Sequence, residues 1–210
     1  MVLAVNLLIT GSSGYIGGNI VKHLSKREFR VFISNRGLER QQLTNKNVLS
    51  MHLEYGKLAE NIKKLQKIDV IIHAAGTNAQ RCLQNPTEAF EFNCLSSFML
   101  ASAARQAGVK KFIYLSTSHV YSAFPTGRFA EDTVTDNPHP YAASRIAGEA
   151  AVQSSAYGSD MQTLIFRISN CVGLPVNKSC NCWHLVSNSL CKQVFTDSRL
   201  MLFSPGSIKG

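Results

Sequence analysis

Short apolar segments alternate along the chain with longer segments in which apolar residues recur at helical spacing. The short segments have the length and β-branched content of strands: Asn6–Thr10, Arg30–Ser34, Val48–Leu53, Asp69–Ala74, Lys111–Ser116 and Gln162–Ile168. The longer segments are predicted helices: Tyr15–Arg27, Leu58–Gln66, Thr87–Ala107 and Tyr141–Ala156. This alternation predicts an α/β fold, a doubly wound parallel sheet with helices on both faces.

Two of the predicted strands contain runs without polar interruption. Val70–Ile72 and Phe112–Leu115 are continuously apolar, which is typical of strands covered on both faces. The segment Ala123–Pro140 holds three of the six prolines and lacks helical or strand periodicity. We expect it to be a long loop, and a loop of this length is a candidate functional segment.

Composition narrows the class of protein. The chain has 210 residues, 45% of them hydrophobic, which is ample for a buried core and excludes wholesale disorder. Its formal net charge is +9, and most of the excess comes from residues 1–67. The basic residues are scattered among apolar ones, so an incidental surface charge is the first explanation and phosphorylated ligands the second. A nucleic-acid partner is not expected.

Membrane and secretory segments are not expected either. No apolar run approaches the roughly 20 residues that cross a bilayer. The opening Val2–Ile9 run lacks a basic flank and continues into a glycine-rich turn rather than a cleavage site. We therefore expect a cytoplasmic protein with no membrane partner.

The six cysteines are expected to be reduced thiols, because no secretory signal is recognised. Cys82, Cys94 and Cys171 lie among apolar residues and are predicted to be small core residues. The cluster Cys180–His184, together with Cys191, offers zinc ligands. However, its C-x-C spacing is tight and no second matching pair exists, so no metal site is expected.

A glycine-rich turn follows the first predicted strand and opens the first predicted helix. Gly11 permits the tight turn, Gly14 lets the backbone approach a pyrophosphate, and Gly17 lets the helix pack closely on its strand. The helix N-terminus presents unpaired N–H groups to the anion. This context predicts a dinucleotide site, with a purely structural turn as the alternative. The expected contacts are Gly11, Ser13, Gly14, Tyr15, Ile16 and Gly17.

The G-x-x-G-x-x-G spacing resembles that of the short-chain dehydrogenases/reductases. The segment Thr10–Gly17 is similar in particular to their extended branch, the NAD-dependent epimerase/dehydratase family, which acts on nucleotide sugars. The resemblance implies a Rossmann-like fold whose C-terminal substrate-binding portion is short or truncated here. It divides the chain into a dinucleotide-binding domain, residues 1–170, and the start of an incomplete substrate-binding region, residues 171–210.

The end of the second strand is expected to select the cofactor. An acidic residue there binds the adenosine ribose hydroxyls, whereas an arginine accommodates a 2′-phosphate. This strand ends in Asn35 and Arg36, with no carboxylate before Glu39, and Asn35 stands where the NAD-using relatives carry Asp. The sequence therefore favours NADP, with NAD as the alternative. Arg36 would otherwise be a solvated residue without a ligand.

Further cofactor contacts are implied by the resemblance alone. The segment His73–Gly76 is similar to the family segment that passes close to the cofactor, and Asn93 matches the helix asparagine that steadies the active-site backbone. Met51–Leu53 stands where the family usually has Gly-Asp-Ile/Leu to hold adenine, so adenine recognition must differ in detail. The implied contacts are His52, Leu53, Ala74, Ala75, Gly76, Asn93, Ser116 and Ile168.

The chemistry is expected on the fourth predicted helix. A tyrosine can act as base near neutral pH only where an adjacent positive charge stabilises its phenolate. The family provides this with Tyr-x-x-x-Lys on one helix face, and the lysine also holds the nicotinamide ribose. The segment Pro140–Glu149 resembles this helix, with Tyr141 as the base, but Arg145 replaces the lysine. Arginine keeps the charge but is broader and planar, so turnover is left open. Without the surrounding pattern, the two would be a helix-surface pair.

The third catalytic group is expected after the fifth strand. Tyr114–Tyr121 resembles the family's S-[ST]-x-x-V-Y segment, which makes Thr117 the hydroxyl that bonds the substrate oxygen. Ser116 and Ser118 are the alternatives if the alignment shifts. By the same resemblance, Ser118 and His119 line the sugar pocket.

The segment after the sixth strand, Phe166–Gly173, resembles the family's R-x-x-N-x-x-G. It implies that Asn170 contacts substrate and that Ile168 contacts the nicotinamide side. The leading hypothesis is an NAD(P)-dependent oxidoreductase or epimerase acting on a nucleotide-diphosphate sugar, with hydride transfer at a ring carbon. Dehydration is the least favoured outcome, because Ser118 and His119 stand where a dehydratase carries an acidic residue.

Two other hypotheses remain open at this stage. One is a catalytically impaired NAD(P)-binding protein with a sensing or assembly role, motivated by Arg145 and by the short C-terminal region. The other is a truncated product with an incomplete sugar site. The family commonly dimerises through two long helices, which implies a homodimer through Thr87–Ala107 and Tyr141–Ala156.

Overall fold

The computed structural model describes residues 5–34, 46–54, 56–122 and 127–196. Within them, a parallel sheet has the strand order β3-β2-β1-β4-β5-β6. Its strands are β1 (Asn6–Thr10), β2 (Arg30–Ser34), β3 (Val48–Ser50), β4 (Val70–His73), β5 (Lys111–Thr117) and β6 (Gln162–Ile168). The predicted doubly wound α/β fold is confirmed.

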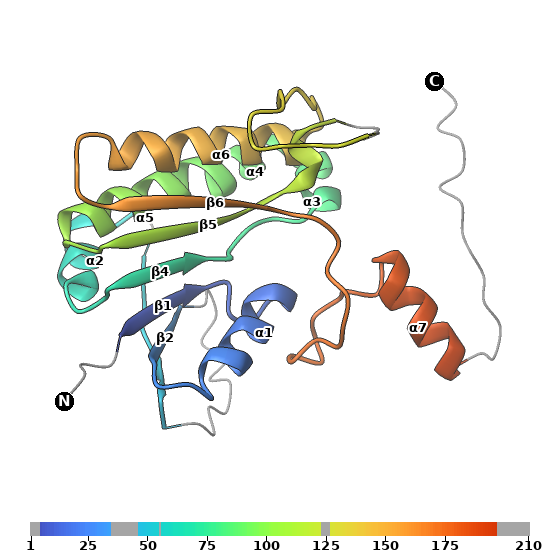
Figure 1. Ribbon diagram of the computed structural model, residues 1–210, viewed down its shortest axis with the longest axis horizontal. Coiled ribbons are helices and arrows are strands. Elements are labelled where there is room, and N and C mark those ends of the chain that lie inside the picture. Colours follow the sequence, from blue (N-terminus) through green and yellow to red (C-terminus); the bar gives the residue numbers. More distant parts are fainter. Residues whose placement is uncertain (1–4, 35–45, 55, 123–126, 197–210) are drawn as a thin grey trace.

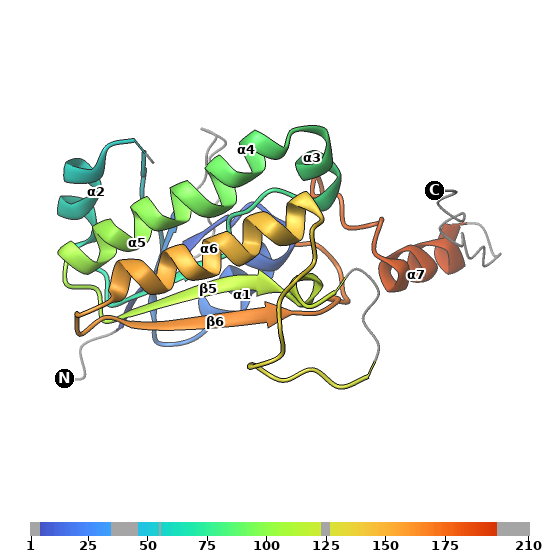
Figure 2. The ribbon, with the colours of Figure 1, turned by 90° about the horizontal axis from the view of Figure 1, so that it is seen from above.

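Helices cover the sheet from both sides. In chain order, the helices of the described residues are α1 (Tyr15–Leu24), α2 (Leu58–Leu65), α3 (Ala79–Gln84), α4 (Pro86–Phe90), α5 (Ser96–Gln106), α6 (Pro140–Ala156) and α7 (Val186–Thr196). Figure 1 and Figure 2 show α5 and α6 on one face and α1 on the other. The strand order reverses between β1 and β4, and right-handed crossovers therefore place the two sets of helices on opposite faces.

The structure departs from the predicted elements in several places. The third strand ends at Ser50, not Leu53, because the ladder with β2 stops there although Met51 and Leu53 are buried. The predicted helix Thr87–Ala107 is α4, a π-helical turn η1 (Glu91–Leu95) and α5 in succession. Helix α3 was not predicted at all; the side chain of Asn78 caps it by accepting from the Arg81 N–H at 2.9 Å.

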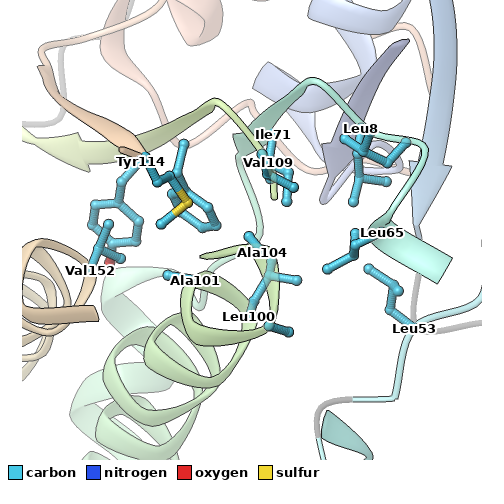
Figure 3. Close-up of a cluster of buried hydrophobic side chains, with 14 of the residues drawn as sticks. Leu8, Leu53, Leu65, Ile71, Leu100, Ala101, Ala104, Val109, Tyr114 and Val152 are labelled. Carbon is cyan, nitrogen blue, oxygen red and sulfur yellow. The ribbon is translucent and has the colours of Figure 1, made fainter. Parts of the chain in front are cut away.

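The main core lies between the sheet and the layer of α2, α5 and α6. Leu8 and Ile71 of the central strands face Leu65 of α2 and Leu100 of α5, all between 0% and 2% exposed (Figure 3). The small residues Ala101, Ala103 and Ala104 of α5 let this helix approach the sheet closely. A second cluster packs α1 against the other face through Ile9, Val21, Val31 and Ile33.

The chain after β6 returns to the start of α1. The hydroxyl of Tyr15 donates to the carbonyl of Gly173 at 3.0 Å, and the amide of Asn19 donates to that of Leu174 at 3.2 Å. The amide of Asn177 reaches the carbonyl of Ser13 at 3.3 Å. These contacts place the beginning of the predicted substrate-binding region beside the glycine-rich turn.

The cysteines divide differently from the prediction. Cys82 is a core residue, whereas Cys94 and Cys171 are only half-buried. Among the described residues, no group of three or more histidine, cysteine or acidic side chains is arranged to hold a metal ion. In the same part of the chain, no helix is both long and apolar enough to cross a membrane.

Candidate active site

The carboxyl ends of β1, β4, β5 and β6 meet along one edge of the sheet. The glycine-rich turn follows β1, His73–Gly76 closes β4, and Thr117 ends β5. Helix α6, with Tyr141 in its first turn, starts at the same edge, over the end of β5 (Figure 2). Open parallel sheets bind ligands at this edge, where the strand order reverses. The fold therefore brings these predicted segments together.

The glycine-rich turn has the shape of a phosphate cradle. Gly11 has a φ of +67°, and a Cβ there would lie 2.6 Å from the backbone nitrogen of Ala75. A Cβ on Gly17 would lie 2.3 Å from the carbonyl oxygen of Gly11, so both positions require glycine. Gly14 is the N-cap of α1 and has no side chain to cap the helix. The N–H groups at the start of α1 thus keep the capacity to bind an anion.

Other residues predicted to contact a cofactor lie in varied surroundings. Ser13 is exposed, whereas Tyr15, Ile16 and Ile168 are half-buried. His52 is exposed, with Nε2 3.5 Å from the carboxylate of Glu54. The side chain of Leu53 belongs to the core. Asn35 and Arg36 lie outside the described residues.

Asn93 occupies the π-helical turn and is completely buried. Its side-chain oxygen accepts from the N–H of Thr77 at 3.0 Å, and its amide donates to the hydroxyl of Ser144 at 2.9 Å. It thereby ties the segment after β4 to helix α6. The carbonyl of Asn93 accepts from the hydroxyls of Ser97 at 2.8 Å and Tyr114 at 3.1 Å. The π-helical turn therefore lies where both the side chain and the backbone carbonyl of Asn93 form hydrogen bonds with other elements.

A buried histidine, not predicted as a site residue, extends the network from Asn93 to β1. Ser97 donates to Asn93, so its oxygen accepts from Nε2 of His73 at 3.1 Å. The Thr10 hydroxyl then donates to Nδ1 of His73 at 2.7 Å. Burial, and secondarily the charge of Arg145, lower the pKa of His73 to about 3. The imidazole is therefore neutral and fixed in one tautomer.

Arg145 is buried, with 7% of its surface exposed, so the interpretation as a helix-surface pair was wrong for this residue. Its Nη1 donates to the Tyr114 hydroxyl and to the carbonyl of Leu115, both at 3.4 Å. Its Nε has no hydrogen-bond partner among the described residues. The guanidinium carbon lies 5.6 Å from the ring centre of Tyr141. Burial opposes the charge, but the phenols of Tyr114 and Tyr141 hold the pKa of Arg145 above its ordinary value.

The side chains of His139 and Asn137 support the start of α6, and Asn137 also joins it to the segment after β5. Nδ1 of His139 accepts from the N–H of Tyr141 at 3.1 Å and so caps the helix. The amide of Asn137 donates to the carbonyl of His119 at 2.7 Å. Thr117 is 5% exposed, and its hydroxyl oxygen accepts from the N–H of His119 at 3.3 Å. The positions of Thr117 and Tyr141 are thus supported by Asn137 and His139, which the sequence motifs did not include.

Positions expected to contact sugar lie at the outer side of this group. The ring of His119 stands edge-on to that of Tyr141, with 6.3 Å between their centres. Ser118 is half-buried, and Asn170, after the end of β6, is exposed. Side chains that are accessible at the mouth of the site are those that can meet a ligand.

Ser116 has a structural partner. Its hydroxyl donates to the carboxylate of Glu149 at 2.5 Å. The same carboxylate receives hydrogen bonds from Nε and Nη2 of Arg167, whose Nη1 donates to the Tyr121 hydroxyl at 3.2 Å. Glu149 and Arg167 thus clamp α6 onto β5 and β6. Arg167 is the first residue of the R-x-x-N-x-x-G pattern, and no sequence pattern indicated a role for Glu149.

A family model and several curated proteins match most of the chain. The model described as the NAD dependent epimerase/dehydratase family matches residues 7–192. The chain is 32% identical over 187 residues to a dTDP-D-glucose 4,6-dehydratase of Homo sapiens, covering 81% of this chain and 52% of that protein. It is 25% identical over 171 residues to a UDP-glucose 4-epimerase of Azospirillum brasilense, covering 80% and 49%. The chain spans about half the length of the curated relatives it matches.

A solved structure is also similar. It is a UDP-glucuronic acid 4-epimerase variant from Bacillus cereus in complex with UDP-4-deoxy-4-fluoro-glucuronic acid and NAD. The two align with a TM-score of 0.80 at 22% identity, covering 96% of this chain and 67% of that one. At this identity the similarity shows a shared fold.

Proposed function

Because the chain belongs to the NAD-dependent epimerase/dehydratase family, we propose that it is an NAD(P)-dependent oxidoreductase or epimerase acting on a nucleotide-diphosphate sugar. One observation carries the proposal: the buried cation of Arg145 lies 5.6 Å from the Tyr141 ring, at the edge of the sheet that also holds Thr117 and the glycine-rich turn. A phenol, a neighbouring positive charge and a hydroxyl can together manage the proton of an alcohol while a cofactor takes its hydride.

The residues present fit a dinucleotide. The cradle formed by Gly11 and Gly17 excludes side chains, and the start of α1 offers backbone N–H groups to a pyrophosphate. The Nε of Arg145, unpaired within the described part of the chain, and the charge of this side chain suit ribose oxygens. When bound, NAD(P) supplies the nicotinamide that accepts and returns hydride. The choice of NADP over NAD is proposed from Asn35 and Arg36, which lie outside the described residues.

Each catalytic side chain has a proposed task. The phenol oxygen of Tyr141 takes the proton from a ring hydroxyl of the sugar and later returns it. Arg145 stabilises the phenolate through its positive charge. Because Arg145 is buried, the surrounding low polarity strengthens this electrostatic attraction. The hydroxyl of Thr117 donates a hydrogen bond to the reacting sugar oxygen. Ser118, His119 and Asn170 are proposed to contact the sugar.

The outcome of the reaction is proposed to be epimerisation or reduction. Dehydration must expel a hydroxyl from the sugar, and the dehydratase pattern places an acidic residue directly after the catalytic Ser/Thr to protonate it. Ser118 and His119 occupy the positions that follow, and neither is acidic. A dTDP-D-glucose 4,6-dehydratase is among the relatives of this chain, so activity with dTDP-glucose is the direct comparison.

The experiment combines binding with turnover. NADPH and NADH are titrated against the chain by nicotinamide fluorescence, and hydride exchange is followed with UDP-glucose and dTDP-glucose. We expect dinucleotide binding and exchange in the wild type. Tyr141→Phe should keep binding and lose exchange by roughly 100-fold or more. His119→Gln serves as a control for the pocket, since it should affect the sugar KM more than cofactor affinity.

Two results would contradict the proposal. If neither dinucleotide binds, the assignment of the glycine-rich turn fails. If the wild type binds tightly but exchanges no hydride, and Arg145→Lys restores exchange, then Arg145 impairs the chemistry instead of supporting it.

A homodimer is also proposed. Phe90, Leu95 and Phe98 lie along α4, η1 and α5 and are 41%, 54% and 39% exposed. An apolar strip on the outer side of a helical layer is typical of a surface that is covered in an assembly. A second copy presenting the same strip would pair with it across a two-fold axis.

A further inference from the structure

Gly76 lies against the guanidinium of Arg145. A Cβ on Gly76 would lie 1.7 Å from Nη2, 2.6 Å from Cζ and 2.9 Å from Nη1 of Arg145. Gly76 is exposed and its φ is not among the positive values of the chain, so its backbone conformation does not itself require glycine. The requirement comes from the space that the arginine occupies.

The guanidinium has little freedom to move away. It is 7% exposed, and Nη1 is held by the Tyr114 hydroxyl and the Leu115 carbonyl at 3.4 Å each. Tyr114 is itself completely buried between the sheet and α6 (Figure 3). Its hydroxyl donates to the carbonyl of Asn93, which leaves its lone pairs for Arg145. A side chain at position 76 would therefore meet a fixed group.

These contacts replace what a charged partner would supply. Among the described residues, Arg145 forms no ion pair, and the nearest carboxylate on α6, Glu149, is engaged by Arg167. A phenol and a carbonyl accept its hydrogen bonds instead, and the rings of Tyr114 and Tyr141 lie 5.8 Å and 5.6 Å from its Cζ. Aromatic rings at such distances attract a buried cation.

We propose that Gly76 and Tyr114 are positioning residues that adapt this site to arginine at position 145. Gly76 provides the width that a planar guanidinium needs, and Tyr114 fixes its orientation, so that the charge stays beside Tyr141. A lysine ammonium is narrower and carries no planar fork. The role in catalysis rests on the proposed function, whereas the coupling between the three residues does not.

The test is a double-mutant cycle with two readouts. Gly76→Ala, Arg145→Lys and the combined variant are compared with the wild type in their urea midpoints and in their NADPH and NADH affinities. Gly76→Ala alone should lower the midpoint and weaken dinucleotide binding by about tenfold. In the Arg145→Lys background the same change should alter affinity by less than about twofold. Gly56→Ala is the matched control, because a Cβ there meets no atom of the described residues within 4 Å.

Tyr114→Phe forms a second cycle with Arg145→Lys. Alone, Tyr114→Phe should lower the urea midpoint. In the Arg145→Lys background the decrease should be smaller, because the lost hydroxyl accepts a hydrogen bond from the guanidinium. If Gly76→Ala is neutral, or equally damaging in both backgrounds, or abolishes folding in both, the proposal fails. Folding that is lost with Gly76→Ala and recovered on adding Arg145→Lys supports it. A chain that binds no dinucleotide refutes the proposed function, while the midpoints still decide the coupling.

Discussion

The carboxylate of Glu149 on α6 receives three hydrogen bonds from Nε and Nη2 of Arg167 on β6, the shortest at 2.8 Å. The side chains are 7% and 22% exposed, so the pair is largely removed from water. The ion pair holds the Arg167 pKa above its ordinary value. Since α6 carries Tyr141 and Arg145, this contact fixes the helix that bears the proposed chemistry.

Removing the arginine leaves a buried carboxylate without its cation. We expect Arg167→Met to lower the free energy of unfolding by about 2–3 kcal/mol, measured by urea denaturation. The matched control is Arg81→Met. Arg81 pairs with Glu88 but is 60% exposed, so its loss should cost less than about 1 kcal/mol. Equal costs for the two variants would contradict a special role for the Glu149 pair.

His73 should make stability depend on pH. Its pKa falls from the ordinary 6.5 to about 3 in the folded chain. Between these values the unfolded state binds a proton that the folded state does not, so the stabilisation present above pH 6.5 is lost as the pH falls. The contribution is roughly 1.4 kcal/mol per pH unit. His73→Asn, which does not titrate, should flatten this part of the curve.

The measurement is urea unfolding of the wild type and His73→Asn at several pH values below about 6.5. The carboxylates titrate in both proteins, so their contributions to the pH dependence cancel in the difference. Parallel curves would show that His73 does not stay neutral in the folded state.

We expect the adjacent hydroxyls of Ser116 and Thr117 to have different roles, one in stability and the other in hydride exchange. Ser116 donates to Glu149, so Ser116→Ala should lower stability by about 1 kcal/mol and retain hydride exchange. Thr117→Val should reduce exchange by roughly 100-fold. Thr117→Ser, which keeps the hydroxyl, is the control and should retain most activity. Loss of exchange in Ser116→Ala alone would shift the catalytic assignment by one residue.

The proposed dimer surface predicts a change of mass. Leu95→Glu and Phe98→Glu place charge on the exposed strip, and light scattering after size exclusion should report a monomer. Phe195→Glu changes a phenylalanine on α7 that is 91% exposed and should leave the mass unchanged. A wild type that is already monomeric would refute the dimer.

Much of the fold was predictable because its signals are local. Runs such as Val70–Ile72 and helical spacing in Tyr141–Ala156 fix strands and helices from their own residues. Three glycines after a strand likewise predict the turn before α1. Helix α3 and the π-helical turn at Asn93 escaped prediction, since they depend on side-chain caps and on bonds to Ser97 and Tyr114.

The sequence by itself determined which groups are available: a glycine cradle, a tyrosine, a threonine and an arginine where the family has lysine. Only the tertiary structure decided how these groups are held. It buried Arg145 without a carboxylate partner among the described residues and placed Gly76 against it. It also brought Ser116 into hydrogen-bond contact with Glu149, and His73 with Ser97. The partners of each pair lie on different elements and far apart in the chain. No local pattern records which side chains will meet once the sheet and helices pack.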